Sequence, residues 1–337
     1  MCFSIAISVC FDYNTYIHLI LSERIVAMEL TNKKQKWFKK EDIPLHLMAL
    51  PTLIWLVIFC YLPIFGLIMA FQDLNITTGI LGSRFVGLKN FEFLFLSTDA
   101  YIITRNTVCY NLVFIVMNMA LAVTMALLLS EIHSRMLAKT LQTIYMLPYF
   151  LSWAVVMIVV SAFLHYDYGM IKKLLLGLGL ADKGLDFYQQ RGLWPYLLVF
   201  INAWKGVGYQ TVLYLAVISG ISHEYYEAAV LDGATKRQQA WYITIPHLRL
   251  VIGISIILAM GSIFRGDFGL FYVVTKDSGR IYPVTDVIDT YIYRALTRLS
   301  NVGMATAAGM YQSVVGFVLI LVVNAIVNKI DPDSAMF

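Results

Sequence analysis

The sequence predicts an all-α integral membrane protein with six transmembrane helices and a charged cytoplasmic loop between spans 4 and 5. Only 14% of its 337 residues are charged, whereas a soluble domain of this length carries about a quarter. The mean hydropathy is +0.72. Helices are expected because backbone groups in lipid need partners within their own segment, and no run alternates with the period of a barrel strand.

A helix of about 20 apolar residues crosses the hydrocarbon core. Six runs meet or approach this length: Leu47–Phe71, Val108–Leu129, Leu141–Leu164, Leu193–Ile221, Leu250–Phe264 and Val302–Val327. The fifth is short, but apolar sequence resumes after Arg265-Gly266-Asp267 and allows a span that reaches Val274. Pro148 predicts a kink in the third span.

Basic residues orient the chain in the membrane. Five lysines in KKQKWFKK (33–40) directly precede the first span, and basic residues near span ends favour the cytoplasmic side. Both termini are therefore expected in the cytoplasm. The expected parts are a cytoplasmic N-terminal segment 1–46, in which 1–27 is interpreted as dispensable upstream sequence, a six-span domain 47–327, its cytoplasmic loop 222–249, and a tail 328–337.

The stretch EYYEAAVLDGATKRQQAWYITIPHL is a compact charged insert between the fourth and fifth spans. Ser222 is placed to cap a short first helix, which Gly233 ends because glycine tolerates the left-handed conformation. Thr235 opens a second helix with the spacing of a capping box. Pro246 is expected to stop that helix before the fifth span. On periodicity alone, an amphipathic connector that lies on the membrane explains the insert equally well.

The insert also carries a motif: E-A-A, three residues, a glycine, nine residues, then I-x-[LI]-P. It resembles the signature loop of the membrane subunits of binding-protein-dependent ABC importers. The resemblance implies a coupling helix that docks into a cytoplasmic ATPase. The coupling residues that it implies are Glu227, Ala228, Ala229, Asp232, Gly233, Ala234, Ile243 and Pro246.

Further stretches, such as WKGVGYQ (204–210) and FRGDFGLFYVVT (264–275), resemble the sugar branch of these permeases. The resemblance covers roughly residues 45–337 and implies import of an oligosaccharide derived from a complex polysaccharide. It also implies a bacterial cell membrane location, nucleotide-binding ATPase subunits, a second related permease subunit and an extracellular solute-binding protein. Membrane lipid is the expected solvent, and no nucleic acid is expected as a partner.

Polar residues at membrane depth are costly and usually functional, and transporter sites often lie where glycine or proline interrupts a span. Two such interruptions are predicted, Trp204–Gln210 and Arg265–Phe268. Ordinary core packing explains the aromatic residues equally well, and Lys205 also has a structural interpretation as an ion-pair partner of Asp267. The candidates for the substrate path are Asn202, Trp204, Lys205, Tyr209, Gln210, Arg265 and Asp267.

Two other classes compete with this interpretation. A secondary transporter driven by an ion gradient needs carboxylates inside its spans, and only Asp267 comes near one. A membrane-embedded zinc enzyme is disfavoured because His223-Glu224 is not followed by a second histidine that could bind the metal. The dipeptide Gly-Lys never occurs, so the chain also lacks the G-x-x-x-x-G-K-[ST] phosphate-binding loop of an ATPase. We therefore expect no catalytic residue, metal or cofactor, and we expect ATP hydrolysis to occur in a separate subunit.

Overall fold

The structure is a computed structural model that describes residues 43–75, 77–180, 182 and 184–330. The five lysines before the first span and the last residues of the tail lie outside the described residues, as do the predictions made for them. The chain divides into two compact units, one that ends at Gly66 and one that begins at Leu67.

The first apolar run is one helical stretch of 26 residues, His46–Phe71, in agreement with the first predicted span. Most of its side chains are exposed, as expected of a helix that lipid surrounds. The stretch consists of α2 (Ile43–Leu56), the π turn η2 (Val57–Tyr61) and the 3-10 segment η3 (Leu62–Phe71).

A short connection follows Phe71 and contains the only strands among the described residues. The two strands pair antiparallel, with Gln72 opposite Phe85. Asn90 holds the start of the first strand, because its Nδ2 donates to the carbonyls of Ala70 (3.0 Å) and Gln72 (2.8 Å). Apart from this pair, all regular secondary structure in the described chain is helical, which confirms the predicted all-α class. The connection comprises β1 (Gln72–Asp73), α3 (Gly79–Gly82), β2 (Arg84–Phe85), η4 (Lys89–Phe91) and α4 (Glu92–Leu96).

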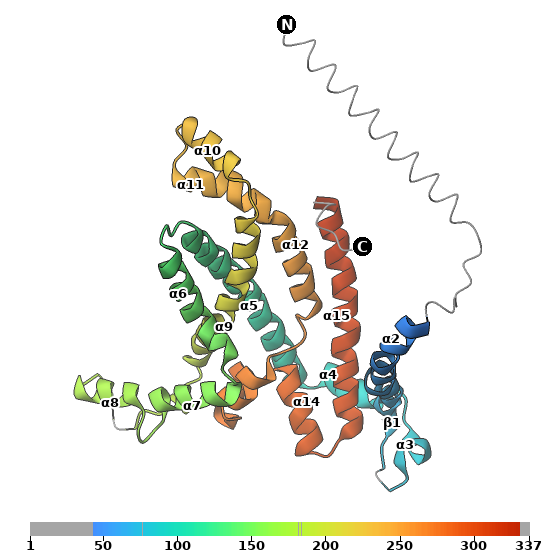
Figure 1. Cartoon of the computed structure of the whole chain (residues 1–337). Helices are drawn as coiled ribbons and strands as arrows, with labels where there is room; N and C mark the ends of the chain where they lie inside the picture. Colours follow the sequence, from blue (N-terminus) through green and yellow to red (C-terminus); the bar gives the residue numbers. More distant parts are fainter. Residues whose placement is uncertain (1–42, 76, 181, 183, 331–337) are drawn as a thin grey trace, which may run out of the picture. The chain divides into compact units, whose positions relative to one another are not determined.

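Four long helices form the framework of the second unit (Figure 1). α5 packs along α9, and α12 packs along α15. A buried cluster of small and apolar side chains, including Ala122, Tyr214 and Leu248, joins α5, α9 and α12. The four helices are α5 (Thr98–Ser130), α9 (Trp194–Ser219), α12 (Ile245–Gly261) and α15 (Val302–Ile330).

The predicted third span is not one straight helix. Helical structure begins earlier than expected, in α6 (Arg135–Met146), and runs through η5 (Leu147–Phe150). The chain then bends by 98° into α7 (Trp153–Leu164), whose N-terminus is capped by Ser152. Pro148, the expected kink, lies in η5 directly before the bend. α7 therefore lies across the direction of α6 rather than along it (Figure 1).

Two predictions about the fifth span are wrong. Pro246 does not stop the helix, which is continuous from Lys236 to Gly261, because the π turn η7 (Ala240–Thr244) precedes the proline and removes the usual i to i−4 bonding at this point. The span also does not continue to Val274. The chain leaves the helix after Gly261 and re-enters helical structure only at η8 (Gly269–Val274), which packs against α7.

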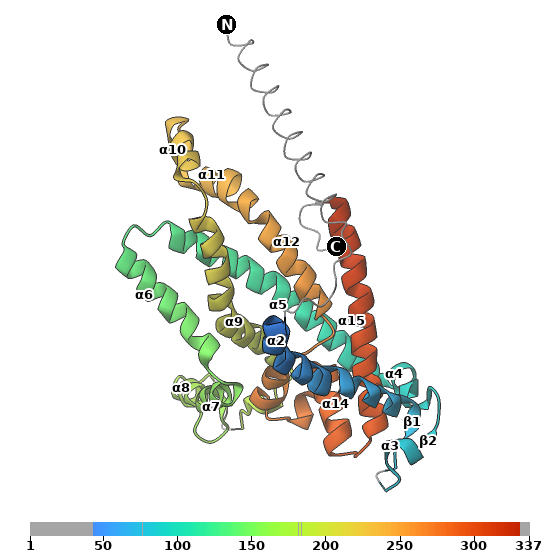
Figure 2. The same cartoon turned by 45° about the vertical axis from the view of Figure 1, so that its right-hand side comes forward.

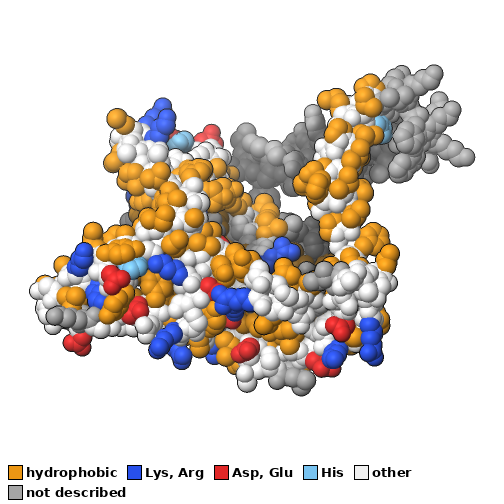
Figure 3. Space-filling model, turned by 90° about the horizontal axis from the view of Figure 1, so that it is seen from below, with side chains coloured by type: hydrophobic (Ala, Val, Ile, Leu, Met, Phe, Trp, Pro, Cys, Tyr) orange, Lys and Arg blue, Asp and Glu red, His pale blue; other side chains and the backbone are white. Residues whose placement is uncertain are grey.

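The remaining helical segments gather at the end of the second unit opposite α10 and α11, which lie in the 222–249 insert (Figures 1 and 2). At this end basic and acidic side chains are scattered among hydrophobic ones (Figure 3). Trp194, Leu270 and Ile281 are fully buried there. The segments are α8 (Met170–Gly177), η6 (Phe187–Gln189), η9 (Gly279–Ile281), α13 (Tyr282–Thr285) and α14 (Ile288–Thr297).

Four helices of the described chain are long and apolar enough to cross a membrane, and the bent α6–α7 pair makes a possible fifth. α9 is long enough, with 26 residues, but is not among the four. Its middle holds asparagine, lysine, glutamine and two glycines, which reduce its hydropathy. The predicted set of six spans is thus matched in part, and the count of six stays a prediction.

Candidate functional site

The insert between α9 and α12 begins with α10 (His223–Leu231), whose two ends are closed by local hydrogen bonds. Ser222 Oγ accepts from the Glu224 N–H at 3.3 Å. At the other end Gly233 has φ of +79°, its N–H donates to Val230, and the Ala234 N–H donates to Ala229. This pair of bonds is a Schellman motif, which needs a residue in the left-handed conformation where the helix ends. Both predicted ends of α10 are therefore present.

The second helix of the insert, α11 (Lys236–Gln239), starts with the predicted capping box. The Gln238 N–H donates to Thr235 Oγ1 at 3.4 Å, and the Thr235 N–H donates to Gln238 Oε1 at 2.8 Å. α11 then runs without a break through η7 into α12. The insert is therefore a bent two-helix unit whose second helix continues without a break into a long helix that is apolar enough to cross a membrane.

The surface of the insert is largely exposed and partly apolar. Leu231 is 89% exposed, Tyr242 80% and Trp241 60%. Among the predicted coupling residues, Glu227, Ala228, Asp232, Gly233 and Pro246 are exposed, while Ala229, Ala234 and Ile243 are half-buried. A side chain added at Gly233 would meet no atom within 4 Å. The insert thus presents small and apolar groups outward instead of packing them against the chain's own helices.

Side-chain contacts tie the parts of the insert to one another and to the end of α5. Within the insert region, the Tyr226 hydroxyl lies 3.0 Å from Thr244 Oγ1, which ties α10 to the start of α12. Lys236 Nζ lies 3.1 Å from a carboxylate oxygen of Glu131, which directly follows α5. A movement of the insert would therefore reach α12 directly and α5 through one ion pair.

The middle of α9 holds most of the predicted substrate-path residues, but the helix is not interrupted there. α9 is continuous through 204–210, contrary to the prediction. Gly208 serves packing instead, because a Cβ atom at this position would overlap the backbone carbonyl of Tyr145 in α6. The glycine lets α6 and α9 approach closely.

Lys205 binds the bend between η5 and α7. Its Nζ donates to the carbonyl oxygens of Tyr149 (2.8 Å) and Leu151 (2.7 Å), and it lies 5.2 Å from the ring centroid of Trp153. These carbonyls lie where the helix breaks, so they lack the bonds that a continuous helix supplies. Lys205 satisfies them, and it makes no ion pair with Asp267 or any other described carboxylate.

Two aromatic side chains of α9 keep exposed faces. Tyr209 is 53% exposed and stacks on Tyr149 with ring centroids 4.7 Å apart, and Trp204 is 39% exposed. Neither is a buried core residue. Asn202 is half-buried and accepts a hydrogen bond from Asn118 of α5 at 2.8 Å, and Gln210 is also half-buried.

The second predicted interruption, Arg265–Phe268, is a real break in the helix. Asp267 Oδ1 accepts from the N–H groups of Gly269 (3.0 Å) and Leu270 (3.2 Å), so it caps the start of η8. Gly269 packs directly against the Trp153 ring, which Lys205 also faces. Lys205 of the continuous helix α9 and Gly269 at the break after α12 therefore both lie against Trp153, while the Arg265 side chain is exposed.

Several residues that shape this region were not predicted. Asn111 Nδ2 donates to the carbonyls of Ile263 and Arg265, and Asn118 binds Asn202. Both asparagines stand in an otherwise apolar run, so the rule that identified Lys205 also applies to them. The role of Trp153 carries no comparable signal, because aromatic residues are common throughout apolar runs.

Residues 118–332 match the family described as binding-protein-dependent transport system inner membrane component. The chain belongs to this family. The predicted resemblance is thereby confirmed, because the matched family consists of membrane components of binding-protein-dependent transport systems.

Relatives in this family cover nearly the whole chain. Protein LplB of Bacillus subtilis (strain 168) is 32% identical over 302 residues, which are 90% of this chain and 92% of LplB. YteP of the same organism, a polygalacturonan/rhamnogalacturonan transport system permease protein, is 32% identical and covers 86% of this chain and 89% of its own length.

The same permease fold occurs in a solved transporter. A chain of a bacterial ABC transporter involved in the import of the acidic polysaccharide alginate has a TM-score of 0.79 and 31% identity, and the match covers 87% of this chain and 97% of that one. A second structure, in complex with an alginate pentasaccharide-bound periplasmic protein, gives a TM-score of 0.77, with 86% and 96% covered.

Proposed function

We propose that this family member is the permease subunit of an ABC importer for an oligosaccharide, and that it forms half of the translocation path. Two lines of similarity support a sugar: YteP is a permease of a polygalacturonan/rhamnogalacturonan transport system, and both matched structures are of bacterial alginate ABC transporters. The other proposed components are two ATPase subunits, a second related permease and an extracellular solute-binding protein. The proposed topology has six spans with both termini in the cytoplasm of a bacterial cell.

One observation carries the coupling part of this proposal: local hydrogen bonds fix both helices of the insert, and its outer surface is exposed. Local bonds fix α10 and α11, while Leu231, Trp241 and Tyr242 remain exposed. Exposed apolar groups around small residues suit a protein partner more than solvent. The coupling residues Glu227–Ala229, Asp232–Ala234, Ile243 and Pro246 are accordingly assigned to an ATPase cleft.

The proposed mechanism uses the continuity of the insert with α12. ATP binding closes the two ATPase subunits and draws their coupling inserts together. Because Lys236–Gly261 is one helix, movement of α11 moves the cytoplasmic half of α12 as a rod. The Lys236–Glu131 pair carries part of that movement to the end of α5. The two permease chains thereby switch between inward-open and outward-open arrangements.

The proposed substrate path follows the middle of α9 and the break after α12. Exposed rings of Trp204 and Tyr209 offer apolar faces for sugar rings, and amide groups of Asn202 and Gln210 offer hydrogen bonds. Lys205 holds the bend between η5 and α7, and Asp267 and Arg265 border the path at the helix break. The ion-gradient alternative is not favoured, because Asp267 caps η8 and the chain belongs to a binding-protein-dependent family.

The docking proposal is tested by adding bulk to the insert. Ala228 is exposed in mid-helix, so Ala228→Trp fits the chain but blocks close approach of a partner. We expect the purified variant to lose the ATPase in a pull-down while keeping the second permease. Gln190→Trp, an exposed position at the opposite end of α9, is the matched control and keeps both. Normal ATPase recovery with Ala228→Trp would show that the insert docks elsewhere.

A further inference from the structure

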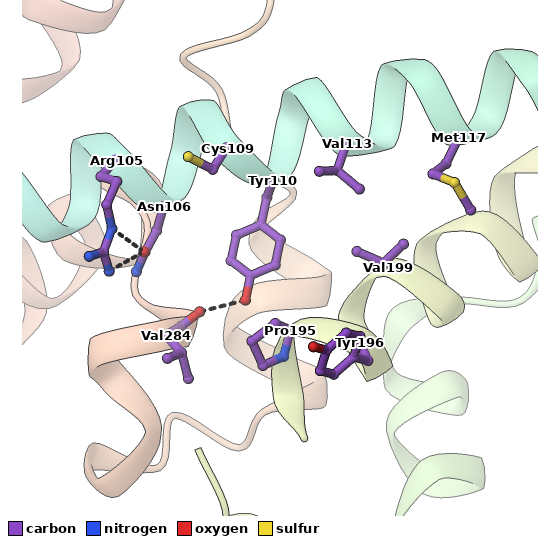
Figure 4. A pocket seen from close by; sticks show the side chains of 10 residues that line it. All are labelled: Arg105, Asn106, Cys109, Tyr110, Val113, Met117, Pro195, Tyr196, Val199 and Val284. Carbon is purple, nitrogen blue, oxygen red and sulfur yellow. Dashed lines mark hydrogen bonds between the residues drawn. The ribbon is translucent and has the colours of Figure 1, made fainter. Parts of the chain in front are cut away.

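An open cavity of about 490 Å³ lies between α5 and the first turns of α9 (Figure 4). Cys109, Val113 and Met117 of α5 form one wall, and Tyr196 and Val199 of α9 form the other. Val113 and Met117 are each about 40% exposed, and Tyr196 is 78% exposed. The cavity is therefore a groove on the surface of the helix pair, with almost purely apolar walls.

The polar groups at the floor of this groove are bonded to one another. The Tyr110 hydroxyl donates to the carbonyl of Val284 at 2.7 Å, and Asn106 Nδ2 donates to the carbonyls of Pro283 (3.3 Å) and Asp286 (3.0 Å). A sugar in the groove would find few free partners for its hydroxyl groups. An acyl chain requires none, so the walls suit a hydrocarbon ligand.

Arg105 lies at one end of the groove, and Met117 lies at the other (Figure 4). The Arg105 guanidinium donates to Asn106 Oδ1 and to the Pro283 carbonyl, but it forms no ion pair with any carboxylate among the described residues. Arginine carries five donors, and none of the hydrogen bonds found for this residue uses its Nη1 group. A positive charge with free donors therefore stands at the head of an apolar groove.

The dimensions of the groove match one membrane leaflet. Arg105 and Met117 are 12 residues apart on α5, or about 18 Å at 1.5 Å per residue. Half of the hydrocarbon core is about 15 Å thick. Arg105 is near the end of α5 that lies away from the insert, so it belongs at the outer interface in the proposed topology. Tyr101, 6.0 Å from the Arg105 guanidinium, is a typical interfacial aromatic residue.

We propose that this groove binds an anionic phospholipid, with the headgroup phosphate on Arg105 and an acyl chain along Cys109, Val113 and Met117. Guanidinium groups bind phosphate oxygens through paired, charge-assisted hydrogen bonds. The outer-leaflet position rests on the proposed topology, but the proposal does not depend on which residues contact the transported sugar. The groove ends at Met117, next to Asn118, which binds the substrate-path candidate Asn202. The proposed ligand is a lipid of the outer leaflet, and it is neither the transported sugar nor a neighbouring subunit.

Cys109 is an exposed thiol in the groove wall and serves as the probe. Cys2, Cys10 and Cys60 are replaced by serine, and the full membrane complex is placed in nanodiscs of phosphatidylcholine with or without phosphatidylglycerol. Phosphatidylglycerol is expected to slow the reaction of Cys109 with N-phenylmaleimide about fivefold, the effect of one basic residue on an anionic lipid. Arg105→Gln removes this difference, whereas Arg84→Gln, an exposed arginine outside the groove, retains it.

Two further arms identify the occupant. Soluble glycerol phosphate added to phosphatidylcholine nanodiscs should not protect Cys109, because it has no acyl chain; protection would show a free phosphate ligand instead. Native mass spectrometry should show phosphatidylglycerol retained by the parent complex and lost from Arg105→Gln. Equal Cys109 rates in both lipids would overturn the proposal. A thiol that is unreactive in every lipid would also overturn it, because a protein subunit would then cover the groove.

Discussion

The two connections that flank α12 are built in opposite ways. The insert before α12 is held by bonds between residues a few positions apart, such as the Thr235–Gln238 capping box. The connection after α12, residues 262–301, is held by bonds to distant helices. Ile288 N–H donates to Thr107 Oγ1 of α5, and Gln312 of α15 donates to the Phe264 carbonyl. One connection is self-contained and exposed, and the other is part of the core.

A cluster of charged residues strengthens the connection after α12. Arg294 donates to Asp277 at 3.0 Å and also binds Asp286, and both carboxylates are at most 10% exposed. Arg298 binds Asp277 from the surface. Burial alone would lower the pKa of Arg294, but its hydrogen bond to Asp286 and the charges of both aspartates outweigh burial and raise the pKa. The guanidinium therefore stays charged at every physiological pH.

This difference separates a docking surface from a fixed support. The insert keeps apolar groups exposed and relies on few contacts with its own chain, as a surface that moves with a partner requires. The connection after α12 fixes the ends of α5, α12, α14 and α15 relative to one another. Mutations should therefore reduce overall stability in the connection and alter only local order in the insert.

Arg294→Ala should give the largest effect. It leaves the Asp277 and Asp286 carboxylates buried without their main partner, and removal of one member of a buried ion pair costs about 3–5 kcal/mol. We expect the detergent-solubilised complex to lose several degrees of melting temperature by tryptophan fluorescence. Arg298→Ala is the control, since Arg298 is more than half exposed and its loss should matter much less. Equal effects of the two variants would contradict the assigned roles.

Asn111→Leu should cause the second-largest loss of stability, confined to the break after α12. The side-chain amide of Asn111 donates to the carbonyls of Ile263 (2.9 Å) and Arg265 (3.1 Å) at the point where the chain leaves α12. Loss of the amide leaves these carbonyls without that donor, and an unsatisfied carbonyl costs about 1–3 kcal/mol of folding free energy. Hydrogen exchange should accelerate across 262–270 and remain unchanged in α10. Unchanged exchange in both regions would show that the break after α12 is held by other contacts.

The contrast also explains which features the sequence predicted. The caps of α10 and α11 were predicted correctly because a capping box and a left-handed glycine act over a few residues. The apolar runs likewise predicted most spans, since lipid exposure is a property of each segment alone. The family motif then added the assignment of the insert, which periodicity did not provide.

Most features that the sequence did not predict depend on contacts between distant residues. Pro148 predicted a kink in the third span, but not the contact that stabilises the 98° bend of α6–α7. There Lys205 binds the carbonyl of Leu151, which is 54 residues away. The end of α12 is fixed by Asn111, which is 152 residues from Ile263. The passage of the helix through Pro246 is the exception, since it depends on the adjacent π turn η7, for which the sequence carries no recognised signal. Hydrogen bonds between residues that are 54 or 152 positions apart cannot be predicted from local helix signals.

A third variant, Gly233→Val, tests the insert. Gly233 has φ of +79°, and a side chain there costs about 1–2 kcal/mol in the left-handed conformation, although the space around it is open. We expect faster hydrogen exchange in α10 with an unchanged melting temperature of the complex. Gly233→Asn should lose less order, because asparagine tolerates this conformation. A lower melting temperature with Gly233→Val would mean that the insert contributes to the core.

Lys236→Gln should have the smallest effect. Its partner Glu131 lies 3.1 Å away, but both side chains are well exposed, at 67% and 47%, so the pair contributes at most about 0.5 kcal/mol. The melting temperature should not change measurably, and the loss should appear only as greater mobility of spin labels placed in the turn after α5. A stability loss as large as that of Arg294→Ala would show that the insert is held as firmly as the connection after α12, and the contrast between the two would fail.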